Sequence, residues 1–308
     1  MKNSKNNAIV NLRVLSLLQV FLLHYFAGLG MRNFLWVFSI AVPTFLLMSA
    51  YLYGLREQNT VSLGWSFLKK RWWALSNTYY LFLTFVFLFY LVSDYVQIKT
   101  YIVSFLAGLA YITNFGYYLP GCGHLWFMQV LMLCYIVLAF FGKNSIVKAW
   151  FSSSIKTSFL FLGLLILGFV YRGNILVYLF FYMWLYFNAN KLKLLIESMN
   201  TYLIVFLLII GYCLLYTEYA TNYNWGIYIK HFHTCIMALL TIGVFVKYKV
   251  LGFENKVIVY IGTLAMEIYL IHHLFVFSEP IYVSLPITIV LSIILHWLSN
   301  SLKNNKAK

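Results

Sequence analysis

The stretch NLRVLSLLQVFLLHY, from Asn11 to Tyr25, decides how this chain folds. It is mostly apolar, and it carries Arg13 and His24 eleven positions apart. On a helix, eleven steps of ~100° end about 20° beyond three full turns, so both side chains lie on one face, roughly 16 Å apart along the axis. A charged or titratable residue inside a membrane span is costly and marks a functional site by default. The spacing therefore predicts a helix that connects a cation near one membrane surface to a proton-transfer group near the other.

The composition of the whole chain is that of a membrane protein. Of 308 residues, 63% are hydrophobic and 9% are charged, and the mean hydropathy is +0.84. A soluble domain has about a quarter charged residues, and a helix crosses the bilayer with about 20 apolar residues. We expect an all-α polytopic integral membrane protein, a single transmembrane domain over residues 1–308. Its roughly ten spans are expected near residues 9–28, 34–54, 75–96, 124–142, 156–171, 175–190, 200–217, 226–246, 257–277 and 281–300.

The distribution of lysine and arginine predicts how these spans are oriented. The apolar segment 100–118 is short and contains glycine, and we expect a surface or re-entrant piece there rather than a span. With both termini cytoplasmic, all but four of the 22 lysines and arginines then lie on the cytoplasmic side, as the positive-inside rule requires. The net charge of +15 reflects this topology and attraction to anionic lipid. The basic residues are dispersed over short loops, which argues against nucleic-acid binding.

Six of the seven histidines fall in the outer half of the expected spans, and the exception is His296. One interpretation is a reactive cavity that opens outward. The other is that interfacial histidines, like tyrosine and tryptophan, tolerate the headgroup region. His231 and His233 cannot face one metal ion together, because residues two apart on a helix diverge by about 200°. The four cysteines form no CxxC pair, and we expect no metal site.

Glu267 is the carboxylate that we expect deep inside a span. Its segment, LAMEIYLIHH, also carries Tyr269 and His272. A buried carboxylate needs a partner or a proton. Glu267 therefore either orients a catalytic imidazole, pairs with Arg13, or forms a structural bond to another helix, and the sequence leaves these three roles open.

A basic cluster marks the start of the third expected span. The segment FLKKRWWALSNTYY, residues 67–80, places Lys69, Lys70 and Arg71 beside two tryptophans. This composition suits an interfacial anchor, with cations on anionic lipid and tryptophans in the headgroup belt. It equally suits a cytoplasmic patch for a phosphorylated ligand.

A glycine-rich turn precedes the fourth expected span. The segment GCGHLWFMQ, residues 121–129, places His124 and Trp126 directly after two glycines. The segment is either the start of a helix at the membrane interface or part of an outward-facing site.

Together these segments resemble the acyltransferase 3 family, bacterial integral membrane acyltransferases that modify surface glycans. The opening is similar in its Arg13, ten intervening residues and His24. Four further segments resemble family stretches in the same order, so the resemblance covers nearly the whole chain. They are AVPTFLLMSAYLYG (41–54), FLKKRWW (67–73), GHLWFMQVLMLCY (123–135) and MEIYLIHH (266–273).

The resemblance implies transfer of an acyl group, usually acetyl, from cytoplasmic acyl-CoA to a sugar hydroxyl of a cell-surface or lipid-linked glycan, in the bacterial cytoplasmic membrane. It implies no bound cofactor, and it implies acyl-CoA, the saccharide acceptor and membrane lipids as partners. Ala50, Ala74 and Asn77 depart from the residues usual in the family, and Gln129 stands near the position of a usual acid. The chain is therefore more similar to the short stand-alone O-acetyltransferases of polysaccharides.

The residue types agree with this chemistry. A hydroxyl that attacks a thioester needs a base, and a near-neutral imidazole suits that role. His24 is thus expected as the catalytic base, or alternatively as a nucleophile that forms an acyl-imidazole, and Glu267 is the second catalytic candidate. Side chains expected to bind the phosphates of the donor are Arg13, Lys69, Lys70 and Arg71. Side chains expected to contact the acceptor are His124, Trp126, Tyr269 and His272.

Two other classes of membrane protein were weighed against this prediction. A transporter or flippase of a lipid-linked saccharide would suit polar residues and aromatic faces in the outer half. The sequence contains no paired repeats or matching broken helices of the kind that transporters use. A membrane glycosyltransferase usually needs an acidic outer loop, whereas the expected outer side carries only Asp94, Glu218 and Glu279.

Overall fold

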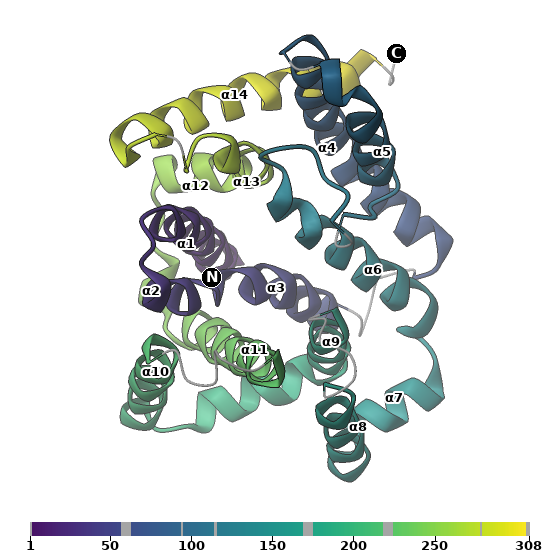
Figure 1. Ribbon diagram of the computed structural model, residues 1–308. Helices are drawn as coiled ribbons and strands as arrows, with labels where there is room; N and C mark the ends of the chain where they lie inside the picture. Colours follow the sequence, from purple (N-terminus) through teal and green to yellow (C-terminus); the bar gives the residue numbers. More distant parts are fainter. Residues whose placement is uncertain are drawn as a thin grey trace.

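The computed structural model describes residues 2–56, 63–93, 95–113, 116–168, 175–217, 224–277 and 279–305. Every regular element in these ranges is a helix (Figure 1), which confirms the predicted all-α class. The α-helices are α1 (Lys2–Gly28), α2 (Arg32–Phe38), α3 (Ala41–Arg56), α4 (Trp65–Ser93), α5 (Ile98–Leu109), α6 (Trp126–Phe141), α7 (Ser145–Ser152), α8 (Ser154–Leu167), α9 (Ile175–Ser198), α10 (Thr201–Tyr216), α11 (Asn224–Lys247), α12 (Lys256–Thr263), α13 (Ala265–Ile271) and α14 (Ile281–Asn305). The short 3-10 helices are η1 (Tyr95–Gln97), η2 (Gly123–Leu125), η3 (Lys249–Gly252) and η4 (His272–Leu274).

Six helical segments of the described chain are long and apolar enough to cross a membrane. They are α1, the run of α2 into α3, and the helices α4, α6, α11 and α14. Three further pairs are bent at a short break, α7 with α8 by 89°, α9 with α10 by 109°, and α12 with α13 by 61°. Length and composition therefore support six to nine spans and a multi-pass membrane protein. The expected count of ten and the cytoplasmic termini stay predictions.

The segment 100–118, which we expected not to cross, contributes the short helix α5. Its 12 residues cover about 18 Å at ~1.5 Å per residue, against a hydrocarbon core of ~30 Å. α5 packs against α4 where Gly108 meets Leu83. The hydroxyl of Tyr79 donates a hydrogen bond of 3.0 Å to the Gly108 carbonyl. The helix thus lies against α4 and is too short to span the bilayer alone.

Helix α3 lies at the centre of the bundle, in contact with α1, α9 and α11 (Figure 1). A Cβ atom at Gly54 would lie 2.3 Å from the carbonyl oxygen of Tyr186 and 2.8 Å from the Cβ of Ala189. In lipid, where hydrophobicity drives little association between helices, small residues allow this close backbone approach. Gly54 therefore sets the distance between α3 and α9, and it fixes the end of α3 that carries Arg56.

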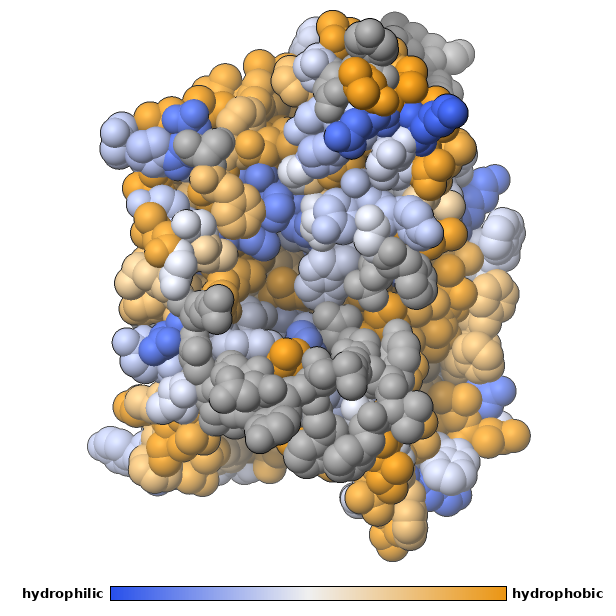
Figure 2. Space-filling model, viewed as in Figure 1, coloured by the Kyte–Doolittle hydropathy of each residue, from blue (hydrophilic) through white to orange (hydrophobic). Residues whose placement is uncertain are grey.

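The outer surface of the bundle is largely apolar, as hydrocarbon requires. Figure 2 shows many apolar, orange side chains along the sides of the molecule, with blue, hydrophilic side chains above the centre and at the upper right of the viewed face. Large exposed apolar side chains are frequent on α4, α8, α10 and α14. The buried core is also mostly hydrophobic, so the polar side chains inside the bundle stand out as candidates for a functional site.

Candidate functional site

Arg13 and His24 both lie on the side of α1 that faces the broken helix α12–α13–η4. Arg13 shares a cavity with Gly262 and Thr263 of α12, and the His24 ring contacts His272 at the start of η4. The predicted common face of α1 is therefore confirmed. One helix carries the cation to one end of the site and the imidazole to the other.

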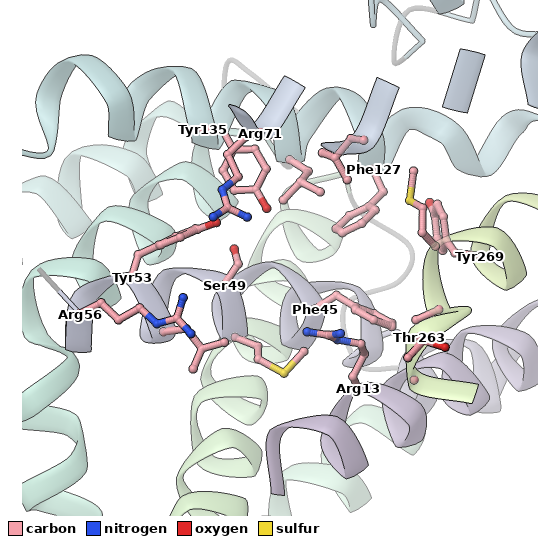
Figure 3. Close-up of a pocket in the computed structure, with 17 residues that line it drawn as sticks. Arg13, Phe45, Ser49, Tyr53, Arg56, Arg71, Phe127, Tyr135, Thr263 and Tyr269 are labelled. Atoms are coloured by element: carbon pink, nitrogen blue, oxygen red, sulfur yellow. The ribbon is translucent and has the colours of Figure 1, made fainter. Parts of the chain in front are cut away.

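The cation end of the site is a cavity of about 410 Å³ between α1, α3, α4, α6 and α12–α13. Three arginines point into it, Arg13 from α1, Arg56 from α3 and Arg71 from α4 (Figure 3). The polar side chains of Ser49, Tyr53, Tyr135, Thr263 and Tyr269 also line it, and its apolar lining residues include Phe45, Met48, Leu52, Leu75, Phe127, Leu131, Ala265 and Met266.

The three guanidinium groups have no carboxylate partner within the described residues. The two ion pairs found there join Lys193 to Glu197 and His296 to Glu267. The Arg71 guanidinium instead lies over the Tyr53 ring at 5.0 Å, and its buried Nε has no hydrogen-bond partner in the part of the chain that the structure describes. Unpaired cations in a semi-enclosed cavity favour an anionic ligand, and arginine forks match phosphate oxygens in particular.

The structure divides the predicted basic cluster. Arg71 lines the cavity, whereas Lys69 and Lys70 are exposed and lie outside its lining. Arg56 belongs to the cavity but escaped the sequence analysis. The signal was present, since Ser49, Tyr53 and Arg56 follow one another at i, i+4 and i+7 and so share one face of α3.

The imidazole end of the site is a cluster of four histidines from α1, η2 and η4. His24 lies 5.1 Å from His272 and 4.6 Å from His273, measured between ring centroids. His124 stacks on His273 at 4.5 Å and lies 5.1 Å from His272. Three histidines predicted to serve the site therefore meet. His273 is a fourth member that the sequence analysis grouped with the outer histidines without a role.

Backbone carbonyls fix the proton on three of these rings. His272 Nδ1 donates to the Tyr269 carbonyl at 2.7 Å, His273 Nδ1 donates to the Gly121 carbonyl at 2.9 Å, and His124 Nε2 donates to the Leu270 carbonyl at 3.2 Å. A carbonyl accepts only, so the opposite nitrogen of each neutral ring is an acceptor.

Two of these acceptor nitrogens, His124 Nδ1 and His272 Nε2, are buried without a hydrogen-bond partner in the described chain. Leaving a buried acceptor unpaired costs about 1–3 kcal/mol. The cluster is therefore suited to a ligand that donates hydrogen bonds, such as a hydroxyl group. His24 differs from the other three, because its imidazole has no hydrogen bond within the described residues, whereas each of the others donates to a backbone carbonyl.

The glycine-rich turn before α6 positions this cluster. Gly121 has φ of 71°, a left-handed conformation that favours glycine. A Cβ there would also lie 2.8 Å from the Leu274 side chain of η4. Gly121 thus allows the turn to approach η4 closely enough for its carbonyl to accept a hydrogen bond from His273 Nδ1.

Tyr269 connects the two ends of the site. Its side chain lines the arginine cavity, and Figure 3 places it beside Phe127 at the end of the cavity that lies away from Arg56 and Arg71. Its ring lies 5.3 Å from that of Phe127 and 5.2 Å from that of His124. Its hydroxyl donates to the His124 carbonyl, and its own carbonyl accepts from His272. Tyr269 therefore contacts the histidine cluster while its side chain lines the arginine cavity.

Glu267 faces α14 and does not line the arginine cavity. Its Oε1 accepts a hydrogen bond of 2.8 Å from His296 Nδ1, and Asn300 Nδ2 donates to His296 Nε2 at 2.9 Å. Of the three roles expected for Glu267, these contacts match a structural bond to another helix. The partner is His296, the one histidine that was not expected in the outer half of a span. The catalytic role of Glu267 stays a prediction.

Trp126 does not line the arginine cavity, although its ring lies 6.5 Å from that of Phe127, which does. Its ring stacks on Tyr178 at 6.0 Å, and the Tyr178 hydroxyl is 3.1 Å from His231 Nδ1. The His231 ring in turn lies 5.8 Å from that of Trp36.

Within the described residues, no group of three or more histidine, cysteine, aspartate or glutamate side chains is placed to hold a metal ion.

Comparison with known protein families bears on the whole of this arrangement. The family model described as an acyltransferase domain matches residues 6–302. The matched range is nearly the complete chain and includes both ends of the site. No curated protein and no solved structure matches the chain.

Proposed function

Because this chain belongs to the acyltransferase domain family that its motifs predict, we propose that it moves an acyl group, acetyl in the first instance, from cytoplasmic acyl-CoA to a sugar hydroxyl of a cell-surface or lipid-linked glycan. The membrane would be the bacterial cytoplasmic membrane, with both termini inside. The family supports the coarser statement, a multi-pass membrane acyltransferase. The donor, the acceptor and the roles of individual residues are argued from the site.

The arginine cavity supports a donor that carries several phosphates. Arg13, Arg56 and Arg71 point into one cavity, and none of them pairs with a carboxylate of the described residues. CoA carries phosphate groups, which arginine guanidinium groups bind in a bidentate manner. On the expected topology this cavity lies toward the cytoplasm, where acyl-CoA is made. Lys69 and Lys70 stand outside it, where they are suited to attract the anionic donor toward the membrane surface.

The histidine cluster supports activation of a hydroxyl. The hydroxyl oxygen forms a bond to the carbonyl carbon of the thioester, and the carbon–sulfur bond breaks. The proton of the hydroxyl passes to a free ring nitrogen of His24 and then to the leaving thiolate of CoA. The unpaired acceptor nitrogens of His124 and His272 would hold the acceptor through its hydroxyl groups.

The observation that carries this proposal is that Tyr269 belongs to both ends of the site. It lines the cavity of the three arginines, and it holds His124 and His272 through its hydroxyl and its carbonyl. A donor anchored by its phosphates would thus present its thioester along Tyr269 to His24, which lies roughly 16 Å from Arg13 along α1.

Transfer of a labelled acetyl group tests the proposal. The purified protein in lipid nanodiscs is mixed with isotope-labelled acetyl-CoA and with glycan-bearing membranes from a strain that lacks the gene. Label is expected in an alkali-labile ester on the glycan. Labelled glycan must be absent when the protein is omitted. If no label reaches the glycan while the same protein moves a saccharide lipid across the bilayer of proteoliposomes, the flippase alternative replaces the acyltransferase.

A further inference from the structure

A second cavity lies beside η4, between α4 and α14, and its volume is about 600 Å³. None of the three arginines and none of the four histidines lines it. The side chains that line it are aliphatic or aromatic, from α4 Phe82, Phe85, Val86, Phe89 and Tyr90, from α13 and η4 Ile271 and Leu274, then Phe275, and from α14 Leu291, Ile294, Leu295 and Leu298. We call it the apolar groove.

The walls of the apolar groove face the hydrocarbon of the membrane. α4 and α14 have the smallest buried shares of the six candidate spans, 33% and 22%. In the groove itself, Phe85, Phe89 and Ile294 are 50%, 64% and 47% exposed. A cavity with this lining at membrane depth excludes charged and strongly hydrated ligands, so its occupant is a hydrocarbon.

The size of the groove favours a flexible chain over a protein helix. A helix about 10 Å wide that rises 1.5 Å per residue fills roughly 120 Å³ per residue, so this volume holds only about five residues of one. A partner helix would therefore lie on the groove rather than in it. A lipid chain fits inside.

The groove is directly connected to the loop that holds the histidines. Leu274 lies in the groove wall and comes within 2.8 Å of the Cβ position at Gly121. The carbonyl of that same glycine accepts a hydrogen bond from His273 Nδ1. Ile271 at the end of α13 and Leu274 of η4 both lie in the groove wall, and they flank His272 and His273 in the chain. A lipid chain in the groove therefore contacts the segment that carries these two imidazoles.

From this juxtaposition we propose that the apolar groove binds the hydrocarbon chain of a lipid-linked saccharide, and that it thereby delivers the sugar hydroxyl to His24. The inference rests on the proposed acyl transfer and specifies how the acceptor approaches. A membrane phospholipid would satisfy the groove chemically, but it brings no sugar hydroxyl to the histidines. Because the surrounding membrane is as apolar as the groove, a lipid chain gains no hydrophobic free energy by entering it. The groove therefore selects and places the chain by its shape and its position.

Filling the groove tests this role. Ile294→Trp places a large ring in the groove, and its matched control is Ile293→Trp. Ile293 does not line the groove and is 38% exposed, and it lies two positions from both Leu291 and Leu295, hence about 200° away around the helix. The glycan ester made in a deletion strain should fall at least about tenfold with Ile294→Trp and stay within about twofold with Ile293→Trp. Binding of acetyl-CoA to either purified variant should be unchanged.

Chemical capture identifies the occupant and keeps the test independent of how well Ile294→Trp inserts. The photo-reactive residue p-benzoylphenylalanine replaces Phe89, an exposed aromatic side chain of the groove wall, or the neighbouring Leu88, which is exposed and does not line the groove. The cells also carry the unmodified gene and so produce the ester. After irradiation, mass spectrometry should find a saccharide-bearing lipid attached at position 89 and phospholipid alone at position 88. Phospholipid alone at both positions, in cells where the ester is made, overturns the groove proposal and leaves the acyl transfer intact. Cells that make the same ester without the gene overturn the acyl transfer itself, whatever is captured.

Discussion

Replacing Arg71 by glutamine tests whether the cavity, rather than the basic surface beside it, binds the donor. Arg71 lines the cavity and Lys70, its neighbour on α4, is exposed outside it. A hydrogen bond to a charged group contributes about 1.5–3 kcal/mol, and about 1.4 kcal/mol corresponds to a tenfold change in affinity. Arg71→Gln should therefore raise the Kd for acetyl-CoA roughly 10- to 150-fold. An exposed charge contributes about 0.2–1 kcal/mol, so Lys70→Gln, with the same change in charge, should raise it less than about fivefold.

The assay is equilibrium binding of acetyl-CoA to the purified variants in nanodiscs, at low and at physiological salt. The effect of Lys70→Gln should shrink as salt screens exposed charges, and the effect of Arg71→Gln should persist. Because the Arg71 guanidinium also lies over the Tyr53 ring, a thermal melt of each variant is needed to confirm that it is folded. Equal losses from both substitutions would refute the assignment of the donor to the cavity.

Three further predictions concern the donor, the packing and the topology. Arg13→Lys keeps the charge but loses the planar fork, so it should weaken acetyl-CoA binding in the same assay; a silent substitution would mean that Arg13 holds only anionic lipid. Gly54→Ala brings a methyl group within 2.3 Å of the Tyr186 carbonyl oxygen. Overpacking of this kind typically lowers the stability of the folded protein by about 1–3 kcal/mol, so the melting temperature should fall. An unchanged melting temperature would contradict the close packing of α3 on α9. The topology is tested in a background without native cysteines. A cysteine at Asn114, which lies outside the described residues, should react with an impermeant thiol reagent in intact cells, and a cysteine at Lys148 should react only after permeabilisation. The reverse pattern would overturn the expected topology.

Periodicity explains why part of the site was predictable. Arg13 and His24 are the two basic side chains in the apolar part of α1, residues 7–28, so their shared face follows from the helical repeat alone. The family motifs then predicted that His124 and His272 would serve the same site, and the structure brings both to His24. A short run of sequence suffices where a few polar residues stand out from an apolar background.

The remaining features depend on contacts between helices, which no local pattern encodes. Which of Lys69, Lys70 and Arg71 points into the cavity depends on how α4 rotates against α3 and α6. The partner of Glu267 is His296, 29 residues away on α14, and no spacing rule relates the two. Arg56 could have been found from its position on one face of α3 with Ser49, although only the folded bundle places that face opposite Arg71.

The central claim is that His24 activates the acceptor hydroxyl at the histidine end of the site. The most direct measurement is the glycan ester, quantified by mass spectrometry, in a deletion strain that carries His24→Gln at the membrane level of the unmodified protein. Glutamine hydrogen-bonds but cannot take up the proton, and loss of a general base typically lowers the rate about 10²–10⁴-fold. The account predicts a glycan essentially without ester, together with unchanged binding of acetyl-CoA to the purified variant. Ester at the level of the unmodified protein would contradict it.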